Sequence, residues 1–216
     1  MIRHAPNLAL LLAGIFCGAA FAAADEESPA EMFTKYSSPD GRFALHAVME
    51  GDLLNGIQII EAKSGRVLAD LSDEVMFSQP EELSLLWTPD SKCCAANFRS
   101  GGRYNTTKFF RWDGKTLAEL VSPEGQLYEK IVEPAKRRDL KTAGKPEDTR
   151  LRRIWDTWET VKWLDDSTAE IHGESTSAYY ENDEPIDIAV GVDATVRFDK
   201  AGEPQLVKTE EVPAGD

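Results

Sequence analysis

Apolar and polar residues alternate along much of this chain with the two-residue period of a β-strand. In the segment 43–49 the apolar residues occupy every second position, as Phe43, Leu45, Ala47 and Met49. Side chains at such positions point to one face of a pleated strand, so the pattern is typical of a strand with one buried face. Similar β-rich segments follow at 56–62 and 107–113. The pattern therefore predicts a β-rich fold.

Longer segments of the same kind lie near the end of the chain. Residues 168–180 and 186–199 are rich in β-branched, aromatic and small side chains, and the turn-forming sequence ENDEP separates them. Turn residues between two such segments favour a hairpin. We expect two long strands there.

The predicted strands recur with a period of about fifty residues. Pro39-Asp40 and Pro89-Asp90 lie 50 residues apart, and KSGRVLADL at 63–71 aligns with WDGKTLAEL at 112–120. Each unit contains an aromatic residue, a Pro-Asp turn and three strands, the last two joined by a glycine turn. Proline sets φ for the turn and aspartate can accept hydrogen bonds from the backbone ahead of it. The units span 36–71 and 87–120, and a third, weaker copy spans 161–209.

The corner sequences SPDGRFAL (38–45) and WTPDSKCCA (87–95) resemble the W-S-P-D-G-K corner of TolB-type β-propeller repeats. The resemblance implies a β-meander scaffold that serves protein contacts, and it supplies no catalytic residue. Three units fall short of a closed ring, because propellers have at least about four blades. We therefore expect an all-β fold of antiparallel, blade-like meanders, either an incomplete propeller or a β-sandwich-like arrangement.

An insertion at about residues 122–157 interrupts the repeat. Ser122 and Pro123 are typical of a helix start, and apolar residues at helical spacing predict a short helix at 123–132, which Pro134 is expected to disturb. A second short helix is predicted before Trp158, with a strand after it. The alternative is a strand through TWETVKWL at 157–164, where aromatic and β-branched residues gather.

The first 24 residues have the layout of a secretory signal peptide. Arg3 and His4 precede an uncharged run from Leu8 to Ala24, and Ala22-Ala23-Ala24 offers an A-x-A cleavage site. We expect residues 25–216 to form a single β-rich domain that is exported to the periplasm or the extracellular space. No later segment is apolar enough to span a bilayer, so no transmembrane span is expected after cleavage.

Signatures of familiar chemistry are missing from the sequence. Cys93 and Cys94 are adjacent, and neighbouring Cα atoms lie closer together than an ordinary disulfide requires. His46 and His172 stand alone in predicted strands, without metal-ligand spacing. No P-loop, G-x-S-x-G or G-x-G-x-x-G motif occurs. We therefore predict no catalytic, cofactor-binding or metal site.

A basic segment is the feature of the sequence that most suggests a function. The whole chain carries a formal net charge of −14, and removal of Arg3 with the signal peptide makes it −15. Only Asp139, Glu147 and Asp148 oppose eight basic residues between positions 136 and 153. These eight are Lys136, Arg137, Arg138, Lys141, Lys145, Arg150, Arg152 and Arg153.

Two interpretations of this segment remain open. The eight side chains can bind an anionic partner, or they can pair with the acidic body of the same molecule. A nucleic acid is not expected as the partner, because the compartment is wrong and no aromatic residue is interleaved with the basic ones. The sequence favours an exported, non-catalytic binding or interaction protein of the cell envelope, whose partner could be another envelope protein. The alternative is a secreted hydrolase with a site assembled across strands.

Overall fold

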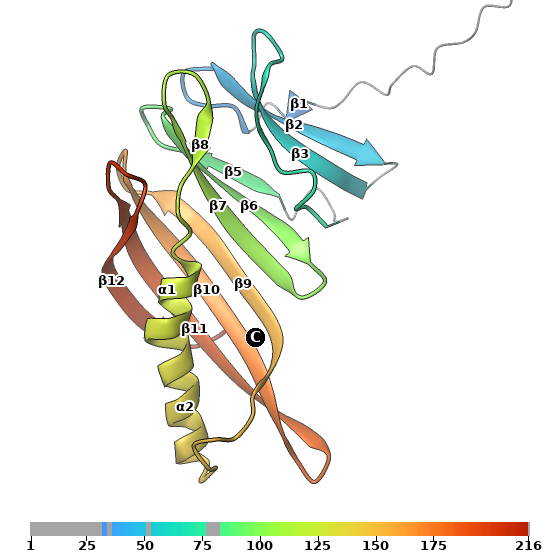
Figure 1. Ribbon diagram of the computed structural model, residues 1–216, viewed down its shortest axis with the longest axis vertical. Helices are drawn as coiled ribbons and strands as arrows, with labels where there is room; N and C mark the ends of the chain where they lie inside the picture. The colour runs from blue at the N-terminus through green and yellow to red at the C-terminus, as the bar shows by residue number, and fades with distance from the viewer. Residues whose placement is uncertain (1–31, 34–35, 51–52, 77–82, 216) are drawn as a thin grey trace, which may run out of the picture.

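The computed structural model describes residues 32–33, 36–50, 53–76 and 83–215, and within them the fold is all-β with one short helical segment (Figure 1). The predicted signal peptide at 1–24 lies outside these residues. The expected fold class, antiparallel β with a short helical insertion, is confirmed. Among the residues that the structure describes, no helix combines the length and the apolar character needed to cross a membrane.

The first unit forms a four-stranded antiparallel sheet with the strands in sequence order. Its strands are β1 (Met32–Phe33), β2 (Phe43–Glu50), β3 (Leu53–Glu61) and β4 (Val67–Asp70). The predicted three-strand unit thus has a short additional strand in front. We call this sheet the first meander.

The rest of the chain forms an eight-stranded sheet. It begins with a second meander of β5 (Ser84–Trp87), β6 (Cys93–Gly101), β7 (Tyr104–Trp112) and β8 (Leu117–Glu119). It continues with β9 (Arg152–Trp163), β10 (Thr168–Glu181), β11 (Glu184–Phe198) and β12 (Pro204–Val212). The order is β12-β11-β10-β9-β7-β6-β5, with β8 beside β7. Neighbours are antiparallel except β7 and β9, which run parallel where Tyr104 and Asn105 oppose Asp156 and Thr157.

The two Pro-Asp corners have the same hydrogen bonds. In the first, the Ser38 hydroxyl donates to Asp40 Oδ1 at 2.8 Å and accepts from the backbone N–H of Phe43 at 3.0 Å. In the second, the Thr88 hydroxyl donates to Asp90 Oδ1 at 2.8 Å and accepts from the N–H of Cys93 at 2.9 Å. The local conformation that the repeat predicts is therefore the same in both units.

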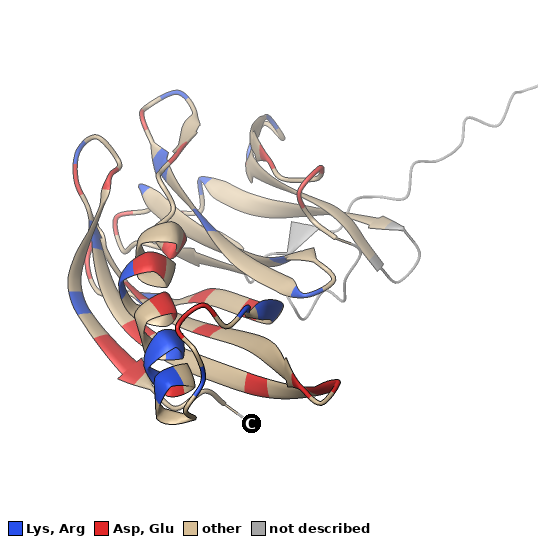
Figure 2. Cartoon of the chain, turned by 60° about the horizontal axis from the view of Figure 1, so that its bottom comes forward, with Lys and Arg blue, Asp and Glu red and all other residues tan. Residues whose placement is uncertain are grey.

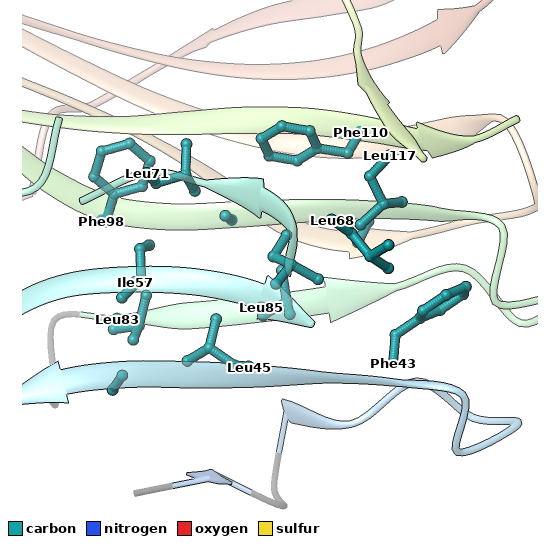
Figure 3. Packing of buried hydrophobic residues seen from close by; sticks show 14 of the residues in the cluster. Phe43, Leu45, Ile57, Leu68, Leu71, Leu83, Leu85, Phe98, Phe110 and Leu117 are labelled. Atoms are coloured by element: carbon teal, nitrogen blue, oxygen red, sulfur yellow. The ribbon is translucent and has the colours of Figure 1, made fainter. Parts of the chain in front are cut away.

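The two meanders share one hydrophobic core. Figure 3 shows side chains of the first meander, such as Leu45 and Ile57, packed against those of the second, such as Leu85. At one end Phe43 stacks on Trp87, with ring centroids 5.3 Å apart and planes 14° apart. Burial of these side chains stabilises the fold because it removes apolar area from water.

Cys93 and Cys94 lie on opposite faces of β6. Cys94 belongs to the core shared by the two meanders, whereas Cys93 points to the other side of the sheet. Both are buried free thiols, and burial raises the pKa of each. Successive side chains of a strand point to opposite faces, which explains why the two thiols do not meet.

The helix is longer than the sequence predicted. It runs through α1 (Glu124–Leu127), a π-type turn η3 (Tyr128–Val132) and α2 (Glu133–Thr142), so the expected end near residue 132 is wrong. Pro134 lies in the first turn of α2, directly after the wider π-type turn. Proline is tolerated at this position because its missing N–H interrupts no α-helical hydrogen bond. Leu127 and Val132 pack against Val190 and Val192 of β11 in a second core.

The second predicted helix, before Trp158, is also wrong. Strand β9 begins at Arg152, and its residues alternate between the two faces of the sheet. Trp158 is buried and stands opposite Gly173 of β10, where a side chain would collide with the indole ring. Leu151, Ile154 and Trp155 follow the i, i+3, i+4 spacing of a helix, but the segment pairs with β10 and is therefore a strand.

The third predicted unit corresponds to β10, β11 and β12. The two long strands expected at 168–180 and 186–199 are confirmed as β10 and β11. Their turn is tighter than ENDEP suggests, because only Asn182 and Asp183 lie outside the strands, with φ of 52° and 67°. Two residues with positive φ are typical of a type I′ hairpin turn.

Candidate functional site

Seven of the eight basic residues of the 136–153 segment line two surface hollows near the C-terminal end of α2. The helix-end hollow has a volume of 470 Å³ and is lined by Arg137, Arg138, Leu140, Lys141, Lys145, Pro146 and Glu147. The arginine hollow has a volume of 640 Å³ and is lined by Thr149, Arg150, Leu151, Arg152, Arg153, Tyr179 and Tyr180. Figure 2 shows the Lys and Arg positions gathered on the last turns of α2. The fold therefore brings most of the basic segment into two adjacent surface sites.

Three of the four basic residues of the helix-end hollow already have acidic partners. Arg137 pairs with Glu133 at 2.8 Å, Arg138 donates to Glu211 at 3.0 Å, and Lys145 pairs with Glu181 at 2.8 Å. Lys141 has no ion pair with any described residue. The interpretation of intramolecular pairing thus holds for most of this hollow.

The arginine hollow differs because two of its guanidinium groups lack an acidic partner among the described residues. Arg150 and Arg152 are exposed, and the Arg152 guanidinium donates a hydrogen bond to the Tyr180 hydroxyl at 3.2 Å. Tyr180 is 52% exposed, whereas Tyr179 is buried and has the Lys145 ammonium 5.3 Å from its ring centroid. Two available guanidiniums beside aromatic rings form a surface that can bind an oxyanion.

Arg153 connects the arginine hollow to the interior. Its guanidinium pairs with Asp156, whose side chain is fully buried, and lies 4.8 Å from the ring centroid of Tyr104. A β-bulge in the β9–β10 pairing opposite Thr176 and Ser177 changes the register at this point. Bulges re-aim side chains, and here Arg153 lies above Asp156 on the helix side of the sheet. Arg153 is therefore already bound to a carboxylate.

Lys136 does not belong to the surface patch, and its prediction as a surface residue is wrong. Its side chain is fully buried between α2 and β10, and its ammonium donates to the hydroxyls of Ser175 and Ser177, each at 2.7 Å. Ser175 in turn donates to Asp156. Burial lowers the pKa of Lys136 to about 8, although Asp156 and Glu133 oppose that shift. Lys136 thus fixes the helix to the sheet through a buried polar network.

This network also bears on the hydrolase alternative, because it places a serine beside a lysine. A lysine activates a serine only when its amine accepts the hydroxyl proton, whereas a charged Lys136 donates to Ser175. Both side chains are completely buried. In this conformation Lys136 and Ser175 therefore contribute packing and hydrogen bonds to the fold, and a substrate cannot reach them.

A second carboxylate lies under the start of the helix. Glu124 accepts hydrogen bonds from the Tyr104 hydroxyl at 2.5 Å and from the Thr106 hydroxyl at 2.6 Å. Burial raises the pKa of Glu124 despite these hydrogen bonds. Glu124 therefore ties the first turn of the helix to β7, as Lys136 ties the last helix to β10.

The two histidines lie on different sheets and do not form a common site. His46 contacts Gln58 at 3.0 Å on the first meander. His172 on β10 contacts Asp193 at 2.7 Å and Glu174 at 3.3 Å, and it lines a hollow of 330 Å³ on the sheet face opposite the helix. Partial burial lowers the pKa of His172, but hydrogen bonds that its ring donates to the Asp193 and Glu174 carboxylates raise the pKa above its ordinary value overall. Among the described residues, no group of three or more His, Cys, Asp or Glu side chains is arranged to hold a metal ion.

Comparisons with known proteins add little to this description. No protein-family model matches the sequence, and no curated protein matches it either. This chain is similar to a solved structure from a structural and mechanistic analysis of two prolyl endopeptidases, with a TM-score of 0.31 and 12% sequence identity. The similarity covers 83% of this chain and 28% of that chain, so this chain spans less than a third of that protein. A similarity at this level supports no functional assignment.

Sequence reasoning identified the arginines of the arginine hollow and missed its two tyrosines. Tyr179 and Tyr180 lie near the end of β10, about 27 residues after Arg152 and Arg153 in the chain but adjacent to them in the sheet. The sequence signal that could have found them is the adjacent aromatic pair Tyr179-Tyr180 directly before the ENDEP turn.

Proposed function

We propose that this protein is an exported, non-catalytic binding protein of the cell envelope that docks an anionic partner through the arginine hollow. The observation that carries the proposal is the pair of exposed guanidiniums, Arg150 and Arg152, without acidic partners among the described residues. In a chain with a net charge of −14, two nearby cations that no described carboxylate neutralises leave a local positive site for an anionic partner.

Other parts of the proposal rest on the sequence. Export is inferred from the signal-peptide layout of residues 1–24. A scaffold role related to TolB-type repeats is supported by two successive four-stranded meanders with the same corner hydrogen bonds. Such scaffolds present binding surfaces at their edges and loops, and the arginine hollow lies at one end of the large sheet.

The proposal is tested by binding to a panel of anionic probes at about 0.15 M salt, where long-range charge effects are screened. The panel contains an acidic peptide, vesicles with anionic lipid and a sulfated polysaccharide. Full-length protein is compared with the Arg150→Gln, Arg152→Gln double variant. The control is Lys63→Gln, Lys115→Gln, which removes the same charge from exposed sites elsewhere.

We expect at least one probe to bind the wild type and the control variant but not the variant that lacks Arg150 and Arg152. If no probe binds the wild type, or if both variants lose binding equally, the proposal is wrong. Equal loss would mean that net charge, and not the arginine hollow, determines binding.

A further inference from the structure

We propose that the arginine hollow is a carboxylate-binding site for an acidic peptide segment. In this site Arg150 and Arg152 bind the ligand, whereas Arg153 stays paired with Asp156, which competes with the ligand for it. This inference rests on the proposed function and names the chemistry of its partner. It follows from the contacts of the three arginines and from the surface around them.

The choice of a carboxylate follows from the guanidinium groups. A guanidinium presents a planar fork of donors that matches a carboxylate with two parallel hydrogen bonds. Within the arginine hollow, Arg153 already forms an ion pair with one oxygen of the Asp156 carboxylate. Arg150 and Arg152 have the same group but no carboxylate among the described residues.

The choice of a peptide follows from the remaining lining. Leu151, Tyr179 and Tyr180 also line the hollow, which has a volume of 640 Å³. Arginine and tyrosine are both enriched where protein surfaces bind other proteins. An exposed Tyr180 can pack against a peptide chain whose acidic side chain reaches the arginines.

A bilayer surface fits this region less well than a peptide does. The tip of the β10–β11 hairpin adjoins the hollow and carries Glu181, Asp183 and Glu184. Figure 2 shows this hairpin tip as an acidic end of the sheet. A planar anionic membrane that contacted Arg150 and Arg152 would also meet these carboxylates, and like charges repel. A narrow peptide can reach the arginines without meeting the tip.

Asp156 sets the strength of the site by competing for Arg153. Asp156 is fully buried, and its two oxygens face the Ser175 hydroxyl and the Arg153 guanidinium. A ligand that recruits Arg153 must therefore separate a buried charge from its partner, which is costly. Neutral asparagine at this position would release Arg153 to the ligand.

The test measures binding of a fluorescent peptide of alternating Glu and Ser residues by anisotropy, with a Gln-for-Glu copy as the neutral control. Arg150→Gln and Arg152→Gln should each weaken binding roughly tenfold, as expected for loss of a charge-assisted hydrogen bond. Lys92→Gln, which removes the same charge far away, should leave affinity unchanged. Asp156→Asn should strengthen binding roughly threefold, and circular dichroism confirms that each variant is folded.

Several outcomes would overturn the inference. Equal binding of the Gln peptide would show that no carboxylate is recognised, and equal effects of Arg150→Gln and Lys92→Gln would show that the hollow is not the site. Weaker binding by a folded Asp156→Asn variant would show that Asp156 does not compete with the ligand for Arg153. Binding of anionic vesicles or inorganic phosphate without binding of the peptide would contradict this inference but leave the proposed function intact, whereas failure of every anionic probe would contradict both.

Discussion

At the scale of single residues, two kinds of position hold the helix and the large sheet together. Gly173 allows the Trp158 indole to lie flat across β10, and Lys136 connects α2 to the serines of the same strand. The first depends on a missing side chain, and the second on a buried charge. Each makes a separate prediction.

Gly173→Ala is expected to destabilise the fold by about 2–3 kcal/mol, because overpacking a dense core costs roughly this much. A Cβ at this position would lie 2.2 Å from Trp158 Cζ3, and the ring is enclosed by the second core. Gly125→Ala is the matched control, since a Cβ there meets nothing within 4 Å. In a helix this change should stabilise by about 0.5–1 kcal/mol. Urea unfolding of both variants measures the difference, and equal effects would contradict the packing described for Trp158.

The buried charge of Lys136 predicts a pH dependence of stability. The pKa of Lys136 is about 8 in the folded protein, below the ordinary lysine value of 10.5 that applies in the unfolded chain. Between these values the unfolded chain binds more protons than the folded one, so stability rises as pH rises. Wild type should therefore gain up to about 3 kcal/mol relative to Lys136→Met between pH 8 and 10.5.

Urea unfolding of the two proteins at pH 7.5, 9 and 10.5 measures this gain. Using the difference between them removes the contribution of other groups that titrate in the same range. A difference that stays constant across the three pH values would show that Lys136 is not desolvated as described.

At the scale of elements, the repeated corner is the most predictable part of the structure. The Pro-Asp pairs fix a local conformation in which a hydroxyl at 38 or 88 satisfies the N–H of the residue that starts the next strand. All the atoms involved lie within five residues, so the sequence pattern alone indicated them. The alternation of apolar residues likewise indicated β10 and β11.

The elements that were mispredicted depend on long-range contacts. The Leu151–Trp158 spacing fits a helix, but pairing of β9 with both β7 and β10 makes it a strand. The helix extends beyond its predicted end because Pro134 does not interrupt it. If the helical spacing of apolar residues is continued past Pro134, Val132, Lys136 and Leu140 fall on one face, and the structure shows that all three are buried. That spacing was the available signal for the burial of Lys136.

The equivalence of the two corners predicts equal costs for equivalent changes. Ser38→Ala and Thr88→Val each leave a buried N–H without its acceptor, which typically costs about 1–3 kcal/mol. The exposed turn variant Ser64→Ala is the control and should change stability by less than about 0.5 kcal/mol. Thermal unfolding compares the three. A large cost at one corner and none at the other would contradict the structural equivalence of the units.

At the scale of the whole molecule, charge is distributed unevenly over an acidic body. Most basic residues of the 136–153 segment are neutralised by ion pairs or buried, which is the expected fate of a cation in a chain of net charge −14. Arg150, Arg152 and Lys141 are the members of that segment without an acidic partner among the described residues. The basic composition of the segment is evident from the sequence. Which of its residues are buried or paired with acidic side chains, and which remain free to bind a partner, depends on the fold.

The most direct test of this account is a nuclear magnetic resonance titration of isotopically labelled protein with the Glu-Ser peptide. The account predicts chemical-shift changes that concentrate on the backbone amides of residues 149–153 and of Tyr179 and Tyr180, and that disappear in the Arg150→Gln, Arg152→Gln double variant. Changes that centre instead on the sheet face around His172, or that persist in the double variant, would contradict it.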